Sequence, residues 1–339
     1  MNVEDMNVEL TRVFTRDEVT TTLQQLHPTK ASGPDGMSAI FFHKYWDIVG
    51  HSITNMVLNV LNSNMPITEI NKTNIALIPK NNQPSKVAEF RPISLCNTTY
   101  KLVSKVLANR LRPILPSIIT ENQSAFNPDR LISDNVLVAF EFMHYLNHED
   151  DRKENYMSIK LDMSKAFNRV EWNFIKEVTE KMGFAKKWVD LIMLCISSLS
   201  YSIIINGEAC GNVIPSRGIR QGDPLSPYLF LLCAEGFSTL IHKAARDNQI
   251  RGMSIGRGCP KITHLLFADD SLFFAKQRSL SVRSLLTSLI VMKRLRGKKI
   301  NTYKSFVFFN PNTPQERKER ILINLGPMQD SRHNKGLSG

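Results

Sequence analysis

The chain has 339 residues with 43 Lys or Arg against 31 Asp or Glu, a net charge of +12, and its 42% hydrophobic content excludes a wholly disordered or collagen-like protein. The longest apolar run, residues 228–234, is far shorter than the ~20 residues that span a bilayer, and the polar N-terminus lacks a signal-peptide pattern. Five scattered cysteines never form a C-x-x-C pair, so we expect an intracellular protein that is not secreted, with neither a disulfide framework nor a zinc site.

Hydrophobic periodicity predicts helices and strands in irregular alternation. Thr15 with Glu18 three residues on is typical of a capped helix start, and Met157, Ile159 and Leu161 alternate as in a half-buried strand. In chain order we predict a helix over 15–26, a turn over 30–36, a helix over 40–62, a strand over 73–79, helices over 100–111 and 135–146, a strand over 156–163, a helix over 170–182, a strand over 201–205, a helix over 227–245, a hairpin over 262–275, a helix over 282–292 and a strand over 305–309. This order favours the α+β class over a doubly wound α/β sheet.

Two acids stand where a soluble core would not place them. Asp269 and Asp270 lie between two strongly apolar runs, at the tip of the predicted hairpin. Adjacent like charges repel unless a cation offsets them, and Mg²⁺ prefers carboxylates together with substrate phosphates. The alternative is a plain Asp-rich turn.

A third acid, Asp162, lies on the polar face at the end of the strand predicted over 156–163. If this strand pairs beside the hairpin, three carboxylates converge across strands roughly 5 Å apart. Such a cluster can hold two divalent ions ~3.5–4 Å apart, which suits in-line displacement at phosphorus. Metal-dependent nucleases and phosphatases use similar clusters, so these residues alone leave the reaction open.

The positive charge is concentrated toward the C-terminal end. Residues 271–315 contain nine Lys or Arg and no Asp or Glu. A concentrated positive field favours a polyanionic partner, most commonly nucleic acid. The alternative is a solvated helix face with acidic neighbours in space.

Several ordered motifs resemble the reverse transcriptases of non-LTR (LINE-type) retrotransposons, in a version typical of plant genomes. The strongest are KLDMSKAF at 160–167, GIRQGDPLSP at 218–227 and FADD at 267–270. Further matching segments lie at 30–36, 77–80, 90–95, 123–126, 132–135, 299–301 and 304–305. The resemblance covers about residues 30 to 310 and, with this many motifs in order, is highly specific.

The resemblance implies a right-hand polymerase of the α+β class with fingers, an antiparallel palm sheet and a missing or truncated thumb. Its implied domains are an N-terminal helical extension over 1–72, a reverse transcriptase domain over 73–310 and a truncated tail over 311–339. The implied activity is RNA-directed DNA synthesis with two Mg²⁺ ions, or Mn²⁺ in their place. RNA template, DNA primer and deoxynucleoside triphosphates are the implied partners, no membrane is involved, and the nucleus is the compartment that the resemblance suggests.

The resemblance also implies roles for individual residues. The catalytic and metal-binding residues are Asp162, Asp269 and Asp270. The nucleotide-binding residues are Lys80, Arg91, Phe167, Gln221, Gly222 and Lys304. The nucleic-acid-binding residues are Lys293, Arg294, Arg296, Lys298 and Lys299.

The chemistry of these side chains suits those roles. The ammonium of Lys80 and the bidentate guanidinium of Arg91 suit a triphosphate. Phe167 matches the aromatic residue that excludes a ribonucleotide 2′-OH, with core packing as its alternative. Lys304 matches a lysine that protonates pyrophosphate, with a plain surface role as its alternative.

The chain also departs from the family pattern. Asn168 stands where Asp is usual, residues 127–129 replace Val-Pro-Gly, and Arg296 and Lys298 replace Ser and Leu. The rival hypothesis is therefore a truncated, catalytically inactive retrotransposon remnant that at most binds nucleic acid. Primer extension on an RNA template distinguishes the two.

Overall fold

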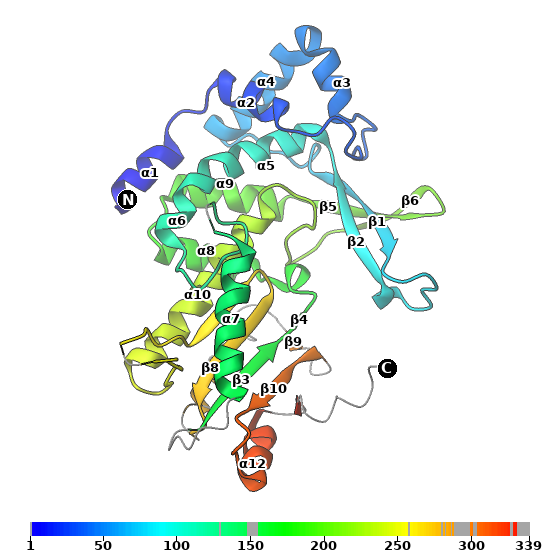
Figure 1. Cartoon of the computed structure of the whole chain (residues 1–339). Helices are drawn as coiled ribbons and strands as arrows, with labels where there is room; N and C mark the ends of the chain where they lie inside the picture. Colours follow the sequence, from blue (N-terminus) through cyan, green and yellow to red (C-terminus); the bar gives the residue numbers. More distant parts are fainter. Residues whose placement is uncertain are drawn as a thin grey trace. The chain divides into compact units, whose positions relative to one another are not determined.

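The computed structural model describes residues 2–128, 130–147, 155–256, 258–278, 281, 283–285, 287, 299–300, 304–325 and 328–330 (Figure 1). The chain divides into two compact units, each made from two segments. Unit 1 comprises Met1–Leu115 and Phe167–Phe230, and unit 2 comprises Pro116–Ala166 and Leu231–Gly339.

Unit 1 contains a four-stranded sheet in the order β2-β1-β5-β6. Its strands are β1 (Lys72–Pro79), β2 (Phe90–Cys96), β5 (Ser200–Ile205) and β6 (Glu208–Val213). β1 is antiparallel to β2 and parallel to β5, whereas β5 and β6 form an antiparallel hairpin. The strands predicted over 73–79 and 201–205 are confirmed. β6 was not predicted, because all six of its residues are exposed and give no buried periodicity.

The other elements of unit 1 are mostly helices. They are α1 (Val3–Thr11), α2 (Arg16–Gln24), α3 (Ala39–Lys44), α4 (Trp46–Ser63), α5 (Thr98–Leu111), α8 (Trp172–Lys181) and α9 (Lys186–Ser197), and the short α6 (Leu115–Ile118) follows α5. The capped helix start at Thr15 is confirmed, with Glu18 closing the capping box. The helical prediction over 40–62 is confirmed except at Tyr45, which leaves the helical conformation and separates α3 from α4. Its ring lies 5.3 Å from that of Phe41.

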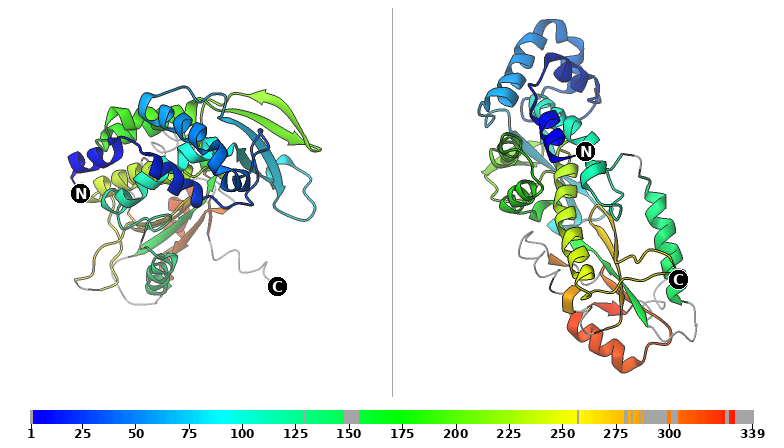
Figure 2. Two further views of the ribbon diagram at one scale, coloured as in Figure 1. Left: turned by 90° about the horizontal axis from the view of Figure 1, so that it is seen from above. Right: turned by 90° about the vertical axis from the view of Figure 1, so that its left-hand side faces the viewer.

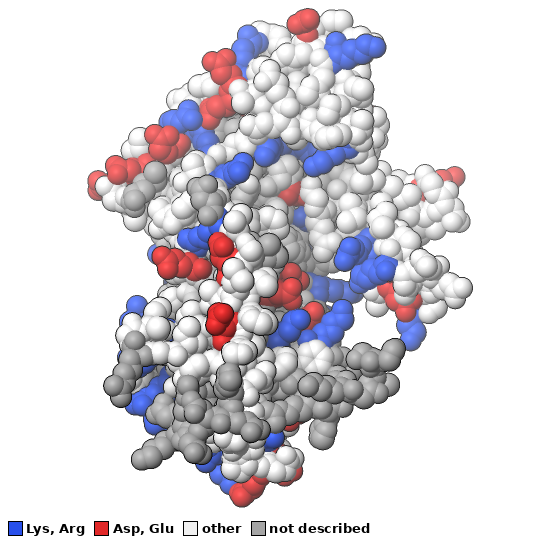
Figure 3. All heavy atoms as spheres, viewed as in Figure 1, with Lys and Arg blue, Asp and Glu red and all other residues white. Residues whose placement is uncertain are grey.

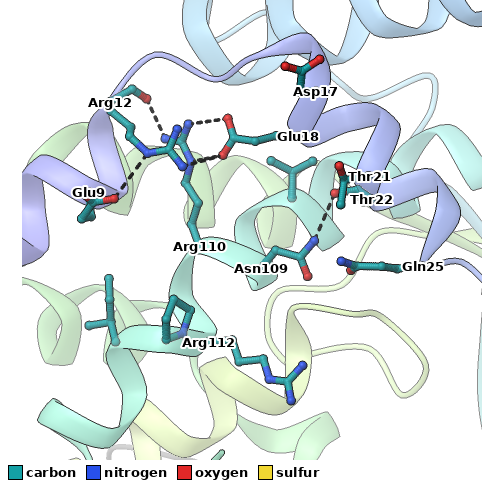
Figure 4. A pocket seen from close by; sticks show the side chains of 13 residues that line it. Glu9, Arg12, Asp17, Glu18, Thr21, Thr22, Gln25, Asn109, Arg110 and Arg112 are labelled. Atoms are coloured by element: carbon teal, nitrogen blue, oxygen red, sulfur yellow. Dashed lines mark hydrogen bonds and ion pairs between the residues drawn. The ribbon is translucent and has the colours of Figure 1, made fainter.

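A buried arginine fastens the N-terminal helices of unit 1 to α5. Arg110 donates to both carboxylate oxygens of Glu18 at 2.8 Å and to the carbonyls of Leu10 and Arg12. Its guanidinium also lies 3.4 Å from the ring centroid of Phe14. Figure 4 shows this cluster beside a cavity of about 720 Å³. Because these charged groups bind one another, we interpret the cluster as part of the scaffold.

Unit 2 is built on a five-stranded sheet in the order β11-β10-β3-β8-β7. The strands are β3 (Tyr156–Leu161), β7 (His264–Phe267), β8 (Asp270–Lys276), β10 (Phe306–Phe309) and β11 (Gln329–Asp330). All neighbours are antiparallel except β10 and β11. A separate two-stranded pair joins β4 (Met163–Ser164) to β9 (Lys299–Ile300). The predicted strand before Asp162 and the predicted hairpin are therefore confirmed.

One helix packs on each face of the unit 2 sheet. Phe142 of α7 (Ile132–Asn147) lies 5.0 Å from Phe274, and Phe237 of α10 (Ser226–Arg246) lies 5.6 Å from Phe273. Adjacent residues of a strand point to opposite faces, so α7 and α10 cover opposite sides (Figures 1 and 2). This mixed architecture with antiparallel sheets confirms the α+β class.

The C-terminal part of unit 2 adds elements that the sequence did not predict. Helix α12 (Gln315–Leu325) is followed by β11, which pairs with β10. The helix predicted over 282–292 falls mostly outside the described residues. In the described part of the chain, no helix is both long and apolar enough to cross a bilayer.

Candidate active site

The three predicted acids lie at the same end of the unit 2 sheet. Asp162 immediately follows β3, whereas Asp269 lies in the β7–β8 turn and Asp270 begins β8. Leu161 pairs with Ser271 across the antiparallel β3–β8 ladder. The ladder ends at that pair, so Asp162 and Asp270 each come one residue beyond it, at the same end of two neighbouring strands. Asp162 is half-buried and the other two acids are exposed, so solvent and ligands reach them.

Lys304 reaches the same end of the sheet from the other side of β3. Phe306 of β10 pairs with Lys160, and Lys304 lies two residues before this strand. The backbone N–H of Asp162 also donates to the Oγ of the buried Ser305 at 3.2 Å. The exposed Lys304 is therefore the chain neighbour of a residue that binds the Asp162 backbone.

Three carboxylates offer the hard oxygen ligands that Mg²⁺ prefers, and their exposure leaves room for substrate oxygens and water. The donor chemistry therefore fits the implied ions. Within the described ranges, no three carboxylate, imidazole or thiol side chains are gathered closely enough to form a metal site. The metal-binding role of the acids stays a prediction.

Lys80 and Arg91 lie on one antiparallel ribbon of unit 1. Ile78 pairs with Arg91, and the ladder continues where the Lys80 N–H donates to the Glu89 carbonyl at 2.8 Å. Directly opposed residues share a face and side chains alternate along a strand, so Lys80 and Arg91 are presented on the same face. The Nζ of Lys80 donates to the carbonyl of Ala88 at 2.8 Å. The ribbon thus brings together the two cations predicted to bind triphosphate.

The loop of Gln221 and Gly222 is attached to this ribbon. The N–H of Ser94, in β2, donates to the Gln221 carbonyl at 3.0 Å. Gly222 has a φ of +104°, and a Cβ there would lie 3.3 Å from the Ser94 carbonyl oxygen. Both the conformation and the close backbone contact require glycine.

A buried ion pair that the sequence analysis missed holds this loop from both ends. Arg220 and Asp223 are paired at 2.8 Å, and both side chains are almost fully excluded from solvent. The Tyr100 hydroxyl donates to Asp223 at 2.7 Å, and Arg220 donates to Asn71 at 2.6 Å. Burial raises the pKa of Tyr100 well above its ordinary value, which keeps that donor protonated. The sequence signal that could have predicted this ion pair is an Arg and an Asp three residues apart, on either side of Gln-Gly.

Phe167 belongs to unit 1 and stacks on Phe230, with ring centroids 4.7 Å apart and an interplanar angle of 9°. It remains half-buried, so part of the ring is accessible. The Phe167 carbonyl accepts from the Ile219 N–H at 3.0 Å, which connects it to the segment before Gln221. Packing and a surface role are therefore combined in this residue.

Cations that the sequence analysis did not single out follow one face of α5. Lys101, Lys105 and Arg112 recur at helical spacing, and Lys101 donates to the carbonyl of Ala31, next to Lys30. Burial lowers the pKa of Lys105, and the charges of Arg112 and Lys30 lower it further. Figure 3 shows Lys and Arg side chains gathered along α5. We call Lys30, Lys101, Lys105 and Arg112 the α5 basic row.

Most of the predicted nucleic-acid-binding residues lie outside the described part of the chain. These are Lys293, Arg294, Arg296 and Lys298. Lys299 lies in β9, where only its backbone is described. Their role stays a prediction.

Known proteins share this sequence pattern. The profile of the family described as "Reverse transcriptase (RNA-dependent DNA polymerase)" matches residues 78–326. Over 263 residues the chain is 26% identical to the "Transposon TX1 uncharacterized 149 kDa protein" of Xenopus laevis, which covers 78% of this chain and 20% of that protein. Over 301 residues it is 26% identical to the "Retrovirus-related Pol polyprotein from type-2 retrotransposable element R2DM" of Drosophila melanogaster, covering 87% of this chain and 27% of the polyprotein.

A shorter relative is an uncharacterized mitochondrial protein of Arabidopsis thaliana. It is 40% identical over 111 residues, which cover 33% of this chain and 90% of that protein. The chain thus spans well under half the length of the two transposon proteins and most of the length of the mitochondrial one.

Proposed function

The chain belongs to the reverse transcriptase family, and we propose that it carries the fingers and palm of an RNA-directed DNA polymerase from a non-LTR retrotransposon. In this proposal unit 2 is the palm and unit 1 supplies the fingers. The polymerase domain extends over 73–310, after an N-terminal extension over 1–72. The observation that supports the proposal best is the register that brings Asp162, Asp270 and the neighbouring Asp269 to one end of an antiparallel sheet.

Asp162, Asp269 and Asp270 would hold the divalent ions. When bound, two Mg²⁺ ions supply a lowered pKa for the attacking 3′-hydroxyl and charge stabilisation for the leaving pyrophosphate. The protein's contribution is to place the three acids at neighbouring backbone positions, from which their side chains would converge on the ions. Lys304, which precedes the Ser305 that binds the Asp162 backbone, is suited to donate a proton to pyrophosphate.

The unit 1 residues bind and select the nucleotide. Lys80 and Arg91, on one face of the β1–β2 ribbon, neutralise the triphosphate. The loop of Gln221 and Gly222 lies against the sugar and the template base. The accessible edge of Phe167 excludes a 2′-hydroxyl by its bulk. The expected products are therefore deoxynucleotide chains.

RNA template and DNA primer are polyanions, and the α5 basic row offers unit 1 a surface for their phosphates. Contacts of this kind release counterions, so binding weakens steeply as salt rises. The undescribed basic stretch between residues 293 and 298 is a second candidate for the same role.

Primer extension on an RNA template with Mg²⁺ tests the proposal. We expect wild type to incorporate deoxynucleotides and Asp269→Asn to lose incorporation. Asp247→Asn is a matched control, since it neutralises an exposed Asp of unit 2 that follows α10. Thermal melting confirms that all three proteins are folded.

Two outcomes contradict the proposal. Equal extension by wild type and Asp269→Asn would place the chemistry elsewhere. A folded wild type that binds primer–template without extending it would favour the inactive remnant.

A further inference from the structure

The turn that carries Asp269 has an unfavourable backbone conformation. Phe267 pairs with Asp270, so Ala268 and Asp269 form a two-residue hairpin loop. Ala268 has a φ of +52°, and of these two residues it alone has a positive φ. A positive φ at only the first loop position is the pattern of a type II′ turn, in which glycine is preferred because a Cβ is disfavoured there. Something must therefore hold Ala268 in place.

The side chain of Gln123 supplies that contact. Its Oε1 accepts from the Ala268 N–H at 3.2 Å and from the Ala125 N–H at 3.0 Å. Gln123 is 1% exposed, so water does not compete strongly for these bonds. The acceptor thus bridges the catalytic turn and the segment that contains Gln123.

That segment lies along the outer edge of β7 as a short parallel partner. Gln123 bridges to Leu266, the Leu266 N–H donates to the Asn122 carbonyl at 2.7 Å, and the Ser124 N–H donates back to Leu266 at 3.3 Å. The backbone contacts end at Leu266. Only the Gln123 side chain extends the contact two residues further, to Ala268.

Hydrogen bonds with Arg130 and Glu235 hold the segment that contains Gln123. Arg130 donates to the carbonyls of Ile119, Thr120 and Gln123 at 3.0, 2.6 and 2.7 Å. Glu235, in α10, accepts from both the N–H and the hydroxyl of Thr120 at 2.9 and 3.0 Å. Gln123 therefore reaches the turn from a fixed support.

A second observation points to a role beyond packing. The Nε2 of Gln123 is buried without a hydrogen-bond partner among the described residues. A buried unpaired donor destabilises the folded state, so the Nε2 gives no reason for a glutamine at this position. The hydrogen bonds of the Gln123 amide are made by its carbonyl oxygen, Oε1.

From this geometry, and resting on the function proposed above, we propose that Gln123 is a positioning residue for Asp269. It holds the Ala268 N–H, keeps the turn in its positive-φ conformation and thereby fixes the direction in which the Asp269 carboxylate leaves the hairpin. It touches neither nucleotide nor primer.

Epistasis between Gln123 and Ala268 tests this role in single-nucleotide extension. Gln123→Met removes the acceptor at nearly constant length. We expect about a tenfold or larger fall in kcat, with the nucleotide KM within about twofold of wild type. Glycine adopts a positive φ without steric cost, so adding Ala268→Gly to Gln123→Met should restore kcat to within about threefold of the Ala268→Gly single variant. A double variant as slow as Gln123→Met would overturn the proposal.

Amide hydrogen exchange tests the hydrogen bond between Gln123 and Ala268 independently of catalysis. If wild type extends no primer, that result contradicts the proposed function but leaves this test valid. In Gln123→Met we expect the Ala268 amide to exchange at least about tenfold faster, while the Leu266 amide keeps its protection. Unchanged exchange at Ala268, or equal loss at both amides, would contradict the role. If Gln123→Met does not fold, Gln123→Asn, too short to reach Ala268, replaces it with the same expected results.

Discussion

Unit 1 and unit 2 fix their candidate functional residues by different means. In unit 1 the Gln221–Gly222 loop lies between Arg220 and Asp223, whose side chains are 1% and 4% exposed and paired at 2.8 Å. In unit 2 the exposed Asp269 and Asp270 are placed by backbone pairing and by the turn. Buried charges are costly to leave unpaired, whereas exposed ones are not. Removing a charge from the buried pair should therefore destabilise the fold of unit 1. Removing a charge from the exposed acids of unit 2 should reduce activity and leave stability nearly unchanged.

The largest expected effect is on catalysis in unit 2. Asp162→Asn preserves shape and removes one charge from the acidic cluster. We expect the extension rate to fall by about a thousandfold or more, because several kcal/mol of metal-assisted stabilisation would be lost. The melting temperature should stay within about 2 °C of wild type. A variant that loses activity only because it unfolds would break the comparison.

In unit 1, removing a charge is expected to lower the stability of the fold. Arg220→Met leaves Asp223 buried without its cation and should lower the free energy of unfolding by about 3–5 kcal/mol. Arg217→Met is the matched control, since Arg217 pairs with Glu171 at 3.2 Å but is 55% exposed. Its loss should stay below about 1 kcal/mol. Denaturant unfolding measures both, and similar losses would show that burial does not set the difference.

A buried histidine in unit 2 predicts a smaller, pH-dependent effect. Burial, with a contribution from His242, lowers the pKa of His264 to about 3. The unfolded chain takes up a proton near pH 6.5, but the folded chain does so only near pH 3, so stability falls as pH drops through this window. Between pH 6.5 and 5, wild type should lose about 1–2 kcal/mol more than His264→Gln. Denaturation midpoints that change equally with pH in the two proteins would show that His264 is not the source of this pH dependence.

The smallest expected effect concerns the α5 basic row. Neutralising Lys105 and Arg112 to Gln should leave stability almost unchanged and reduce the salt dependence of nucleic-acid affinity. We expect the slope of log affinity against log salt to become shallower by about 1 to 2. The control pair Lys176→Gln and Lys181→Gln, exposed on α8, should leave the slope unchanged. Equal slopes in all three proteins would remove α5 from the proposed surface.

Much of unit 2 was predictable because the residues of its strands alternate strongly. Met157, Ile159 and Leu161 are buried as predicted, and the apolar runs around Asp269 form the expected hairpin. Ser158, predicted on the polar face, is buried as well, because a helix covers each face of the sheet. Such regularity comes from a sheet with a fixed core on its faces. The positions of Asp162 and Asp270 followed from that regularity.

Other features had weaker or missed signals. The hairpin before β6 was readable from Asn206–Gly207, a pair whose positive φ values suit a tight turn, although β6 itself is fully exposed. The three-residue spacing of Arg220 and Asp223 indicated that the two could pair. Their burial depends on Tyr100, which is far away in the chain. The positive φ of Ala268 had no local signal, because Gln123 holds it through a tertiary contact.

The central claim is that Asp162, Asp269 and Asp270 hold divalent ions together. Replacing Mg²⁺ by Fe²⁺ with ascorbate and peroxide generates radicals that cut the backbone beside a bound ion, and fragment masses locate the cuts. We expect paired cuts near Asp162 and near Asp269, both suppressed by excess Mg²⁺ and both lost in Asp269→Asn. Cuts at only one of the two segments, or cuts that persist unchanged in Asp269→Asn, would contradict it.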